Sequence, residues 1–289
     1  MTDEQSEPGH LFIFGMGYAA QVLAHALRAR GWQVTGTGRA GTIDFADAAA
    51  VHAALARASH VLSSVPPARE GGDPVLQAYG PALNAWPGQW IGYWSSTGVY
   101  GDARGAWVDE TAPIGGGRRS ARVAADLAWQ ALDARVRVLR LPGIYGPGRS
   151  VIDKLRDGTA HRIIAREQVF SRIHVDDIAG ATLAAFAGPP GVYNLADEEP
   201  ASQNAVVEEA ARLTGLPLPP LLTADEAELS PMARGFYAES RRVCAGKARR
   251  LLDWRPIYPT YREGLRALSA MTKPTIASAE PATASSDQR

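Results

Sequence analysis

The chain has 289 residues, of which 46% are hydrophobic, so it can bury one large core, or one core with a smaller attached lobe. Its 30 basic and 30 acidic residues balance, and basic pairs such as Arg118-Arg119 are typical of solvated helix faces, which argues against a nucleic-acid partner. A single cysteine, Cys244, excludes an intramolecular disulfide and a closed zinc site. The polar start and the lack of a clean apolar run of roughly 20 residues lead us to expect a cytoplasmic protein with no membrane partner.

The first two thirds of the chain predict alternating strands and helices. The apolar run Leu11 to Phe14 ends at a glycine, as a buried parallel strand does, and the stripe from Ala19 to Arg30 has helical spacing. A second strand is expected at 32–37. Further strands are expected at 60–64, 90–95, 136–141 and 191–196, and further helices at 47–58, 74–85, 118–134 and 175–187. This order predicts an α/β fold with a doubly wound parallel sheet of the Rossmann type.

The regular alternation weakens after Leu141, which indicates a second, smaller unit. Segment 152–173 mixes glycines, charges and short β-branched pairs, and the helical stretches after Ala201 are broken by prolines. We therefore expect a dinucleotide-binding domain at 9–149, to which 174–196 returns, and a C-terminal substrate lobe made of 150–173 and 197–271. Residues 1–8 and 272–289 are expected to be disordered.

A glycine-rich turn lies between the first strand and the first helix. In Phe14-Gly-Met-Gly-Tyr-Ala-Ala20, Gly15 permits a tight turn, Gly17 lets the backbone approach a diphosphate, and Ala20 lets helix and strand pack closely. The backbone amides of Met16 to Ala19, including that of Tyr18, are expected to face the phosphates at the helix N-terminus. The turn predicts a dinucleotide site.

The end of the second strand bears on which dinucleotide binds there. An acidic residue about 20 positions after the turn normally contacts the 2′-hydroxyl of NAD, whereas an arginine accommodates the 2′-phosphate of NADP. Thr35-Gly-Thr-Gly-Arg39 has no acid, so Arg39 favours NADP through its planar guanidinium. A solvent-exposed loop arginine is the alternative, and NAD then stays possible.

Further segments follow the turn in a recognisable order. They are Ile43-Asp-Phe-Ala-Asp47, Ser95-Ser-Thr-Gly-Val-Tyr-Gly101, Arg140-Leu-Pro-Gly-Ile-Tyr-Gly-Pro-Gly148, Ile173-His-Val-Asp-Asp-Ile-Ala179, Tyr193-Asn-Leu-Ala-Asp-Glu-Glu-Pro200 and Lys247 to Pro256. With them the chain, from residue 11 to about 268, resembles the extended short-chain dehydrogenase/reductases, the NAD-dependent epimerase/dehydratase group.

The resemblance implies roles for several residues. Asp44 stands where an aspartate contacts the adenine, Ser96 where the family has its catalytic Ser or Thr, and Pro142 in the loop beside the nicotinamide. We also count Ser64, Val65 and Ser95 among the cofactor-binding residues. A nucleotide-sugar or similar hydroxyl-bearing substrate is implied between the sheet edge and the small lobe, and homodimers are common in the family.

The family's acid/base pair is missing from this sequence. Its chemistry needs a tyrosine and, four positions later, a lysine that lowers the tyrosine's pKa; here Arg118 and Arg122 occupy those positions. An arginine stays protonated to about pH 12 and cannot exchange the proton. Tyr100, Tyr145 and His174 are the alternative protic groups, although packing is the favoured role of each; Tyr145 is kept as a catalytic candidate.

Two roles remain open for the other candidate catalytic residues. Ser96 is expected either to donate a hydrogen bond to a substrate oxygen or to satisfy backbone at the strand end, and Arg118 with Arg122 either to bind an anionic substrate or to form a solvated helix face. The leading functional hypothesis is an NADP-linked oxidoreductase or epimerase-like enzyme with a non-standard proton relay. The alternative is an NAD(P)-binding sensor or assembly protein without catalysis.

Overall fold

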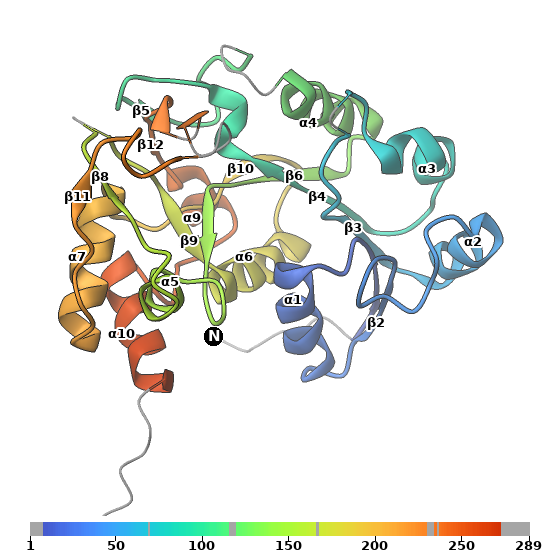
Figure 1. The fold of residues 1–289 in the computed structure, drawn as a ribbon. Coiled ribbons are helices and arrows are strands. Elements are labelled where there is room, and N and C mark those ends of the chain that lie inside the picture. Colours follow the sequence, from blue (N-terminus) through green and yellow to red (C-terminus); the bar gives the residue numbers. More distant parts are fainter. Residues whose placement is uncertain are drawn as a thin grey trace, which may run out of the picture.

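A six-stranded parallel sheet forms the centre of the structure, with strand order β10-β6-β4-β3-β1-β2 (Figure 1). The computed structural model describes residues 8–68, 70–115, 120–165, 168–229, 234–235 and 237–272. The strands are β1 (His10–Phe14), β2 (Gln33–Gly36), β3 (His60–Ser63), β4 (Trp90–Ser96), β5 (Trp107–Val108), β6 (Val136–Leu141), β7 (Gly143–Tyr145), β8 (Arg162–Ile163), β9 (Arg172–His174), β10 (Gly191–Asn194), β11 (Leu221–Leu222) and β12 (Arg242–Val243). The helices are α1 (Tyr18–Arg28), α2 (Ala48–Arg57), α3 (Pro74–Asn84), the 3-10 helix η1 (Thr97–Tyr100), α4 (Ser120–Leu132), α5 (Val151–Arg156), α6 (Val175–Ala187), α7 (Gln203–Thr214), α9 (Gly246–Leu251) and α10 (Tyr261–Thr272).

Helices cover both faces of the sheet. Successive residues of a strand point to opposite faces, and in these strands the residues on both faces are apolar. Leu11 and Ile13 of β1 pack with α1, α6 and α9 on one face. Phe12 and Phe14 pack with α2, α3 and α4 on the other. Trp90 and Trp129 are fully buried on opposite faces, and their indole N–H groups donate to the carbonyl of Ala185 and the carboxylate of Asp73. The doubly wound sheet predicted from the alternation is confirmed.

Successive strands are added to the sheet in opposite directions on the two sides of β1. The chain places β2 on one side of β1 and β3 on the other, with Phe12 paired to Thr35 and to Val61. In open parallel sheets, ligands bind in the crevice outside the carboxyl ends of the strands at such a reversal. The glycine-rich turn, which directly follows β1, therefore lies at the expected ligand crevice.

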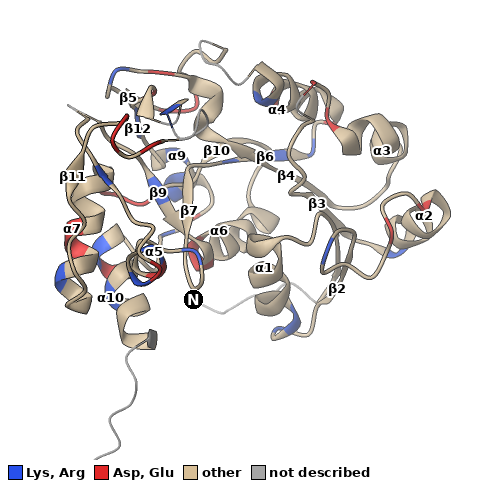
Figure 2. Cartoon of the chain, in the orientation of Figure 1, with Lys and Arg blue, Asp and Glu red and all other residues tan. Residues whose placement is uncertain are grey.

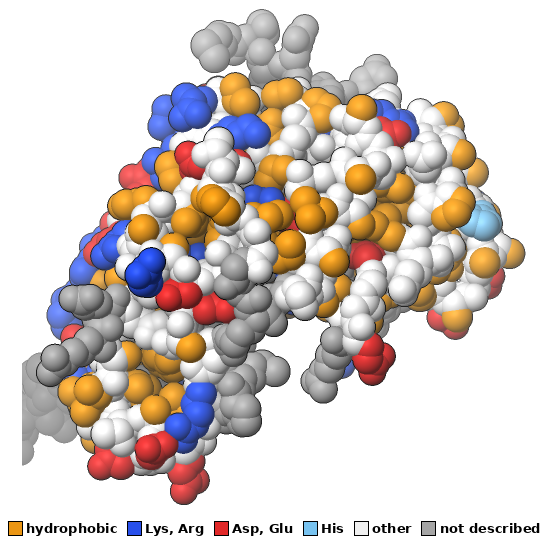
Figure 3. Space-filling model, turned by 90° about the horizontal axis from the view of Figure 1, so that it is seen from above, with side chains coloured by type: hydrophobic (Ala, Val, Ile, Leu, Met, Phe, Trp, Pro, Cys, Tyr) orange, Lys and Arg blue, Asp and Glu red, His pale blue; other side chains and the backbone are white. Residues whose placement is uncertain are grey.

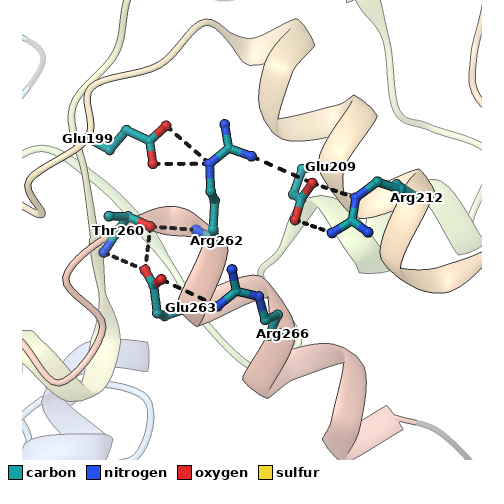
Figure 4. A network of polar contacts seen from close by, with 7 residues as sticks. All are labelled: Glu199, Glu209, Arg212, Thr260, Arg262, Glu263 and Arg266. Carbon is teal, nitrogen blue, oxygen red and sulfur yellow. Dashed lines mark hydrogen bonds and ion pairs between the residues drawn. The ribbon is translucent and has the colours of Figure 1, made fainter.

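A third apolar cluster joins α5, α7 and α10 beside the sheet (Figure 1). Charged residues are frequent on α7 and α10 and sparse on the sheet strands, where β6 is an exception (Figure 2). Arg262 of α10 links Glu199 to Glu209 of α7, and neighbouring pairs extend this network along both helices (Figure 4). Opposite charges thus reinforce the contact between α7 and α10.

The remaining sequence predictions have mixed outcomes. The described part of the helix expected at 118–134 begins at Ser120, and segment 152–173 contains α5, β8 and the start of β9. The proposed domain boundaries stay a prediction. The disorder expected at 1–8 and 272–289 falls almost wholly outside the described residues.

Within the described ranges no helix combines the length and apolarity that crossing a membrane requires. On the face seen in Figure 3, most basic side chains lie toward the left end, whereas acidic side chains occur at both ends.

Candidate functional site

The glycine-rich turn is held from both sides by neighbouring strand ends. Gly15 has φ +89°, and a Cβ there would lie 3.0 Å from both Ser64 Oγ and Val65 Cγ2, so the position requires glycine. Ser64 Oγ donates to the Gly15 carbonyl at 2.5 Å, and the Gly15 amide donates to Thr37 Oγ1 at 3.2 Å. Ser64 and Val65, which the sequence assigned to the cofactor, thus also fix the shape of the turn.

The amides at the start of α1 differ from the expected set. The Met16 amide donates to the Thr37 carbonyl at 2.7 Å and the Gly17 amide to the Gly15 carbonyl at 2.8 Å, so both are used within the chain. Of the amides expected to face the phosphates, those of Met16 and Gly17 are therefore engaged within the chain, which corrects the expectation for these two. Tyr18, Ala19 and Ala20 form the first turn of α1, and Gly17 offers no side-chain cap. Their amides supply the positive end of the helix dipole.

Space for a diphosphate is available at this helix end. A Cβ at Gly17 would meet no atom within 4 Å, although its φ of −85° suits any residue. In contrast, a Cβ at Gly36 would lie 2.3 Å from the Ile13 carbonyl oxygen, and one at Gly38 would lie 3.0 Å from the Met16 nitrogen. Glycine at 36 and 38 is explained by packing, whereas no atom of the described residues would crowd a side chain at Gly17, the N-cap of α1. The residues present fit a dinucleotide.

Arg39 and Asp44 are both exposed near this turn. Arg39 follows Thr37 and Gly38, which contact the turn itself, and among the described residues it makes no ion pair. Asp44 Oδ1 accepts the Ala46 amide at 3.0 Å, which shapes the loop before α2. Arg39 is therefore placed beside the site with its guanidinium open to a ligand.

The end of β4 carries Ser96 and Thr97. Ser96 is half-buried, and its Oγ accepts the Gly98 amide at 3.1 Å and caps η1. Because the hydroxyl acts as an acceptor there, its own proton stays available for donation to a substrate oxygen. Both roles considered for Ser96 are thus compatible. Thr97, which the sequence did not single out, is buried and lines a large cavity.

A buried polar network lies beneath the β4 end. Asp126 of α4 is fully buried and accepts two hydrogen bonds from Arg140 of β6, at 2.7 and 3.0 Å, and one from Ser95 Oγ at 2.6 Å. Arg140 also donates to Tyr100 Oη at 2.9 Å, and Tyr100 donates to Asn194 Oδ1 at 2.8 Å. Ser95 and Tyr100 therefore have structural partners. The only sequence signal for this network was a carboxylate within the apolar stripe of α4.

Two arginines, Arg118 and Arg122, stand at the family's tyrosine and lysine positions. Arg118 lies outside the described residues. Arg122 is half-buried on α4, and its positive charge opposes the effect of burial, which raises the pKa of Tyr93 on β4. Arg122 therefore lies on the side of α4 that faces the sheet.

The other protic candidates are largely enclosed. Burial, with the charges of Asp197 and Asp177, raises the pKa of Tyr145, and its hydroxyl is buried without a partner next to Gly264 of α10. His174 caps α6 through its Nδ1, which accepts the Asp176 amide at 3.2 Å, and burial lowers its pKa. These contacts favour packing and capping roles for Tyr145 and His174.

A cavity of about 820 Å³ lies between the β4 end and the α5, α7 and α10 cluster. Pockets of this size are typical of small-molecule sites. Among its lining residues are the sequence-predicted Tyr145, together with Thr97, Arg149, Lys154, Arg172 and Arg241. Arg241 is paired with Glu239 at 3.1 Å, and Arg172 is held by the carbonyls of Phe170 and Ala201.

Near Arg172 lies a carboxylate that the sequence did not single out. Asp197, three residues after β10, is buried, and neither of its oxygens accepts a hydrogen bond of ordinary geometry from another described residue, although the backbone of Glu199 and of Arg172 lies near enough to lower its pKa. Burial raises its pKa to about 8, although the nearby Arg172 opposes that shift. Tyr261 Oη is buried and unpartnered in the same way. The inner side of the cavity thus contrasts with the fully bonded network around Asp126.

Known proteins are similar to this chain in sequence and in fold. No family model matches the sequence. The Escherichia coli (strain K12) protein YeeZ is 30% identical over 262 residues, which are 80% of this chain and 92% of YeeZ. The structure of a functionally unknown conserved protein from Silicibacter pomeroyi DSS is 43% identical with TM-score 0.81, covering 92% of this chain and 100% of that one.

More distant structures share the fold. The human epimerase family protein SDR39U1, solved with NADPH, is 17% identical with TM-score 0.71 and covers 90% of this chain and 99% of its own. MoeE5, solved with UDP-glucose and NAD, is 22% identical with TM-score 0.72, covering 91% and 98%. With the similarity to YeeZ over most of both sequences, the sheet and the motifs, the chain belongs to the extended short-chain dehydrogenase/reductase family, the NAD-dependent epimerase/dehydratase group, as an atypical member.

Proposed function

We propose that this protein is an NADP-linked oxidoreductase or epimerase-like enzyme that acts on a small polar or nucleotide-linked substrate. The observation that carries the proposal is the turn at Gly15 and Gly17, which is rigidly held yet open where a diphosphate would approach. A cavity of about 820 Å³ that reaches Thr97, next to Ser96, provides room for the substrate.

The chain's own residues have separable roles in this proposal. The amides of Tyr18 to Ala20 hold the diphosphate, and Pro142 adjoins the nicotinamide in the loop after β6. A bound nicotinamide would supply or accept the hydride. Ser96 donates a hydrogen bond to the substrate oxygen, and the Gly98 amide keeps the serine hydroxyl oriented for this. Arg122 provides a positive charge on α4, near Tyr93 of β4.

The missing tyrosine limits which reactions are efficient. General acid/base catalysis is typically worth about 10² to 10⁴ in rate, so ordinary alcohol oxidation would be slow without it. Reduction of a substrate that needs little proton donation at the transition state suits this site better. We therefore expect reductions with NADPH to outpace alcohol oxidations with NADP.

The preference for NADP is attributed to Arg39. Its guanidinium is exposed beside Gly38 and has no ion-pair partner among the described residues, so it is available to a 2′-phosphate. We expect Arg39→Gln to weaken NADPH binding about 10-fold and to leave NADH binding unchanged, measured by calorimetry. Arg57→Gln, an exposed arginine at the end of α2, serves as the charge-matched control. Equal losses for both nucleotides, or none, would contradict the assignment.

Turnover tests the enzyme hypothesis itself. Purified protein is incubated with NADPH or NADH and a panel of carbonyl and nucleotide-sugar compounds, and nucleotide oxidation is followed by absorbance. Ser96→Ala should lower kcat on any substrate found, with nucleotide affinity unchanged. If no compound is turned over although NADPH binds, the enzyme hypothesis fails.

A second candidate is an NAD(P)-binding sensor without catalysis. The observation that favours it is the loss of the family's acid/base pair: arginines stand at 118 and 122, and the Tyr145 hydroxyl is enclosed against α10. This candidate predicts that NADPH changes the oligomeric state or partner of the protein without being consumed. Stereospecific hydride loss from bound NADPH during turnover would exclude it.

A further inference from the structure

Tyr18 ties the glycine-rich turn to the loop after β7. It is the first residue of α1, and its hydroxyl donates to the Pro147 carbonyl at 3.0 Å. A Cβ at Gly146 would lie 2.5 Å from the Tyr18 oxygen, so glycine there allows the two segments to meet. The contact spans 129 positions of sequence and brings the 146–149 loop to the positive end of α1.

Arg149, which ends this loop, is stacked over the same tyrosine. Its Cζ lies 5.7 Å from the centre of the Tyr18 ring, within the range of a cation–π contact. The Arg149 amide donates to the Gly146 carbonyl at 3.0 Å, which closes the loop. The side chain is exposed and also lines the large cavity. Arg149 therefore lies where the nucleotide turn and the cavity meet.

The charge balance of the turn leaves a place for this arginine. A diphosphate carries about two negative charges, and segment 15–21 contains no Lys, Arg, Asp or Glu to balance them. Arg149 forms no ion pair with another described residue. Two acidic charges near Tyr18, those of Asp176 and Asp153, raise the pKa of Tyr18 in addition to its burial. The Asp153 carboxylate accepts hydrogen bonds from the Ser150 amide and hydroxyl, and Asp176 lies 3.5 Å from His174 Nδ1.

We propose that Arg149 binds the diphosphate of the dinucleotide, with the Tyr18 ring as the platform that holds its guanidinium in place. The assignment rests on the proposed function, because it requires a dinucleotide at the Gly15 turn. A planar guanidinium forms paired hydrogen bonds to phosphate oxygens. The amides of α1 reach the diphosphate from one side only, and Arg149 would reach it from the other. The arginine would thus complete a clamp between α1 and the 146–149 loop.

Binding of three nucleotides tests the clamp by calorimetry. NADPH and ADP-ribose both contain the diphosphate, whereas adenosine 2′-monophosphate lacks it. We expect Arg149→Gln to bind NADPH and ADP-ribose about 10-fold more weakly and adenosine 2′-monophosphate as the wild type does. Arg156→Gln removes an equal charge from the exposed end of α5, outside the cavity lining, and should change none of the three affinities.

Variants at residue 18 test the platform. Tyr18→Phe keeps the ring and should cost much less affinity for ADP-ribose than Tyr18→Ala. Combining Tyr18→Ala with Arg149→Gln should add little to the loss from either change alone, because both remove one contact.

The outcomes separate this assignment from the proposed function. If wild-type protein binds NADPH and ADP-ribose but Arg149→Gln binds them equally well, the clamp is overturned and the proposed function stands. If only an unrelated anion such as inorganic phosphate loses affinity in Arg149→Gln, the arginine serves the substrate cavity and the clamp is again overturned. Absence of NADPH binding to the wild type overturns both.

Discussion

The α4 side of the sheet and the cavity side of this molecule bury polar groups in different ways. On the α4 side, Asp126 is fully buried but its carboxylate accepts hydrogen bonds from Arg140, Ser95 and Gln130. On the cavity side, the Asp197 carboxylate and the Tyr261 hydroxyl are buried and make no side-chain hydrogen bond of ordinary geometry with another described residue. Unpartnered buried polar groups cost free energy, whereas a fully bonded network is rigid. The difference indicates a rigid frame between α4, β4 and β6 beside a region whose buried polar groups are less completely bonded.

The largest effect is expected at the network on the α4 side. Asp126→Ala leaves the Arg140 guanidinium buried without its carboxylate, which typically costs about 3–5 kcal/mol. The free energy of unfolding should fall by this amount in urea titrations. Arg266→Ala removes half of an exposed pair with Glu263 on α10 and should cost at most about 1 kcal/mol (Figure 4). A similar small loss for both variants would show that the network is not a rigid frame.

The second effect concerns pH on the cavity side. Because burial raises the pKa of Asp197 to about 8, the folded chain keeps a proton that the unfolded chain releases near pH 4. This group therefore lowers wild-type stability as the pH rises from about 4 to 8. Asp197→Asn does not titrate, so its stability relative to wild type should rise across that window, by at most about 1.4 kcal/mol per pH unit.

Urea unfolding of both proteins at several pH values measures this difference directly. The comparison of two curves is needed because His60, whose pKa burial lowers to about 4, affects stability in the opposite direction between about pH 6.5 and 4. His60 is present in both proteins and its contribution cancels. Parallel stability curves for wild type and Asp197→Asn would show that Asp197 is ionised in the folded chain.

The smallest effect is expected at Tyr261. Its hydroxyl is buried without a hydrogen-bond partner among the described residues, so Tyr261→Phe is expected to lose no hydrogen bond and to remove a desolvated polar group. Stability should stay unchanged or rise by up to about 1 kcal/mol, measured by thermal and urea unfolding. A loss above about 1 kcal/mol would show that the hydroxyl is bonded in solution, and the contrast between the two sides would weaken.

Sequence reasoning captured the nucleotide side because its signals are local. The strand, Gly15, Gly17 and the helix follow one another within a few residues. Arg39 is likewise recognised from its own short segment at the end of the second strand. The details that failed depend on distant segments. The Met16 amide is taken by Thr37, 21 positions away, because β2 pairs with β1. That pairing sets which amides are left for a ligand.

The cavity side offered no comparable signal. Arg172 approaches Asp197 because β9 and the end of β10 converge, and Thr97 reaches the cavity because η1 turns the chain directly after β4. Asp126 gave a faint signal as an acid between Ala125 and Trp129 on the buried side of α4, but its partner Arg140 lies on another strand. Such pairs depend on tertiary packing, which no short motif encodes.

The central claim is that a dinucleotide diphosphate lies against Gly17, and one variant tests it most directly. In Gly17→Ala the new Cβ meets no atom of the chain within 4 Å, so the thermal unfolding midpoint should stay close to that of the wild type. Calorimetry should nevertheless show NADPH binding to the wild type and a loss of at least about 10-fold in the variant, because the methyl group occupies the path of the phosphates. Equal NADPH affinity in the two proteins would contradict the account.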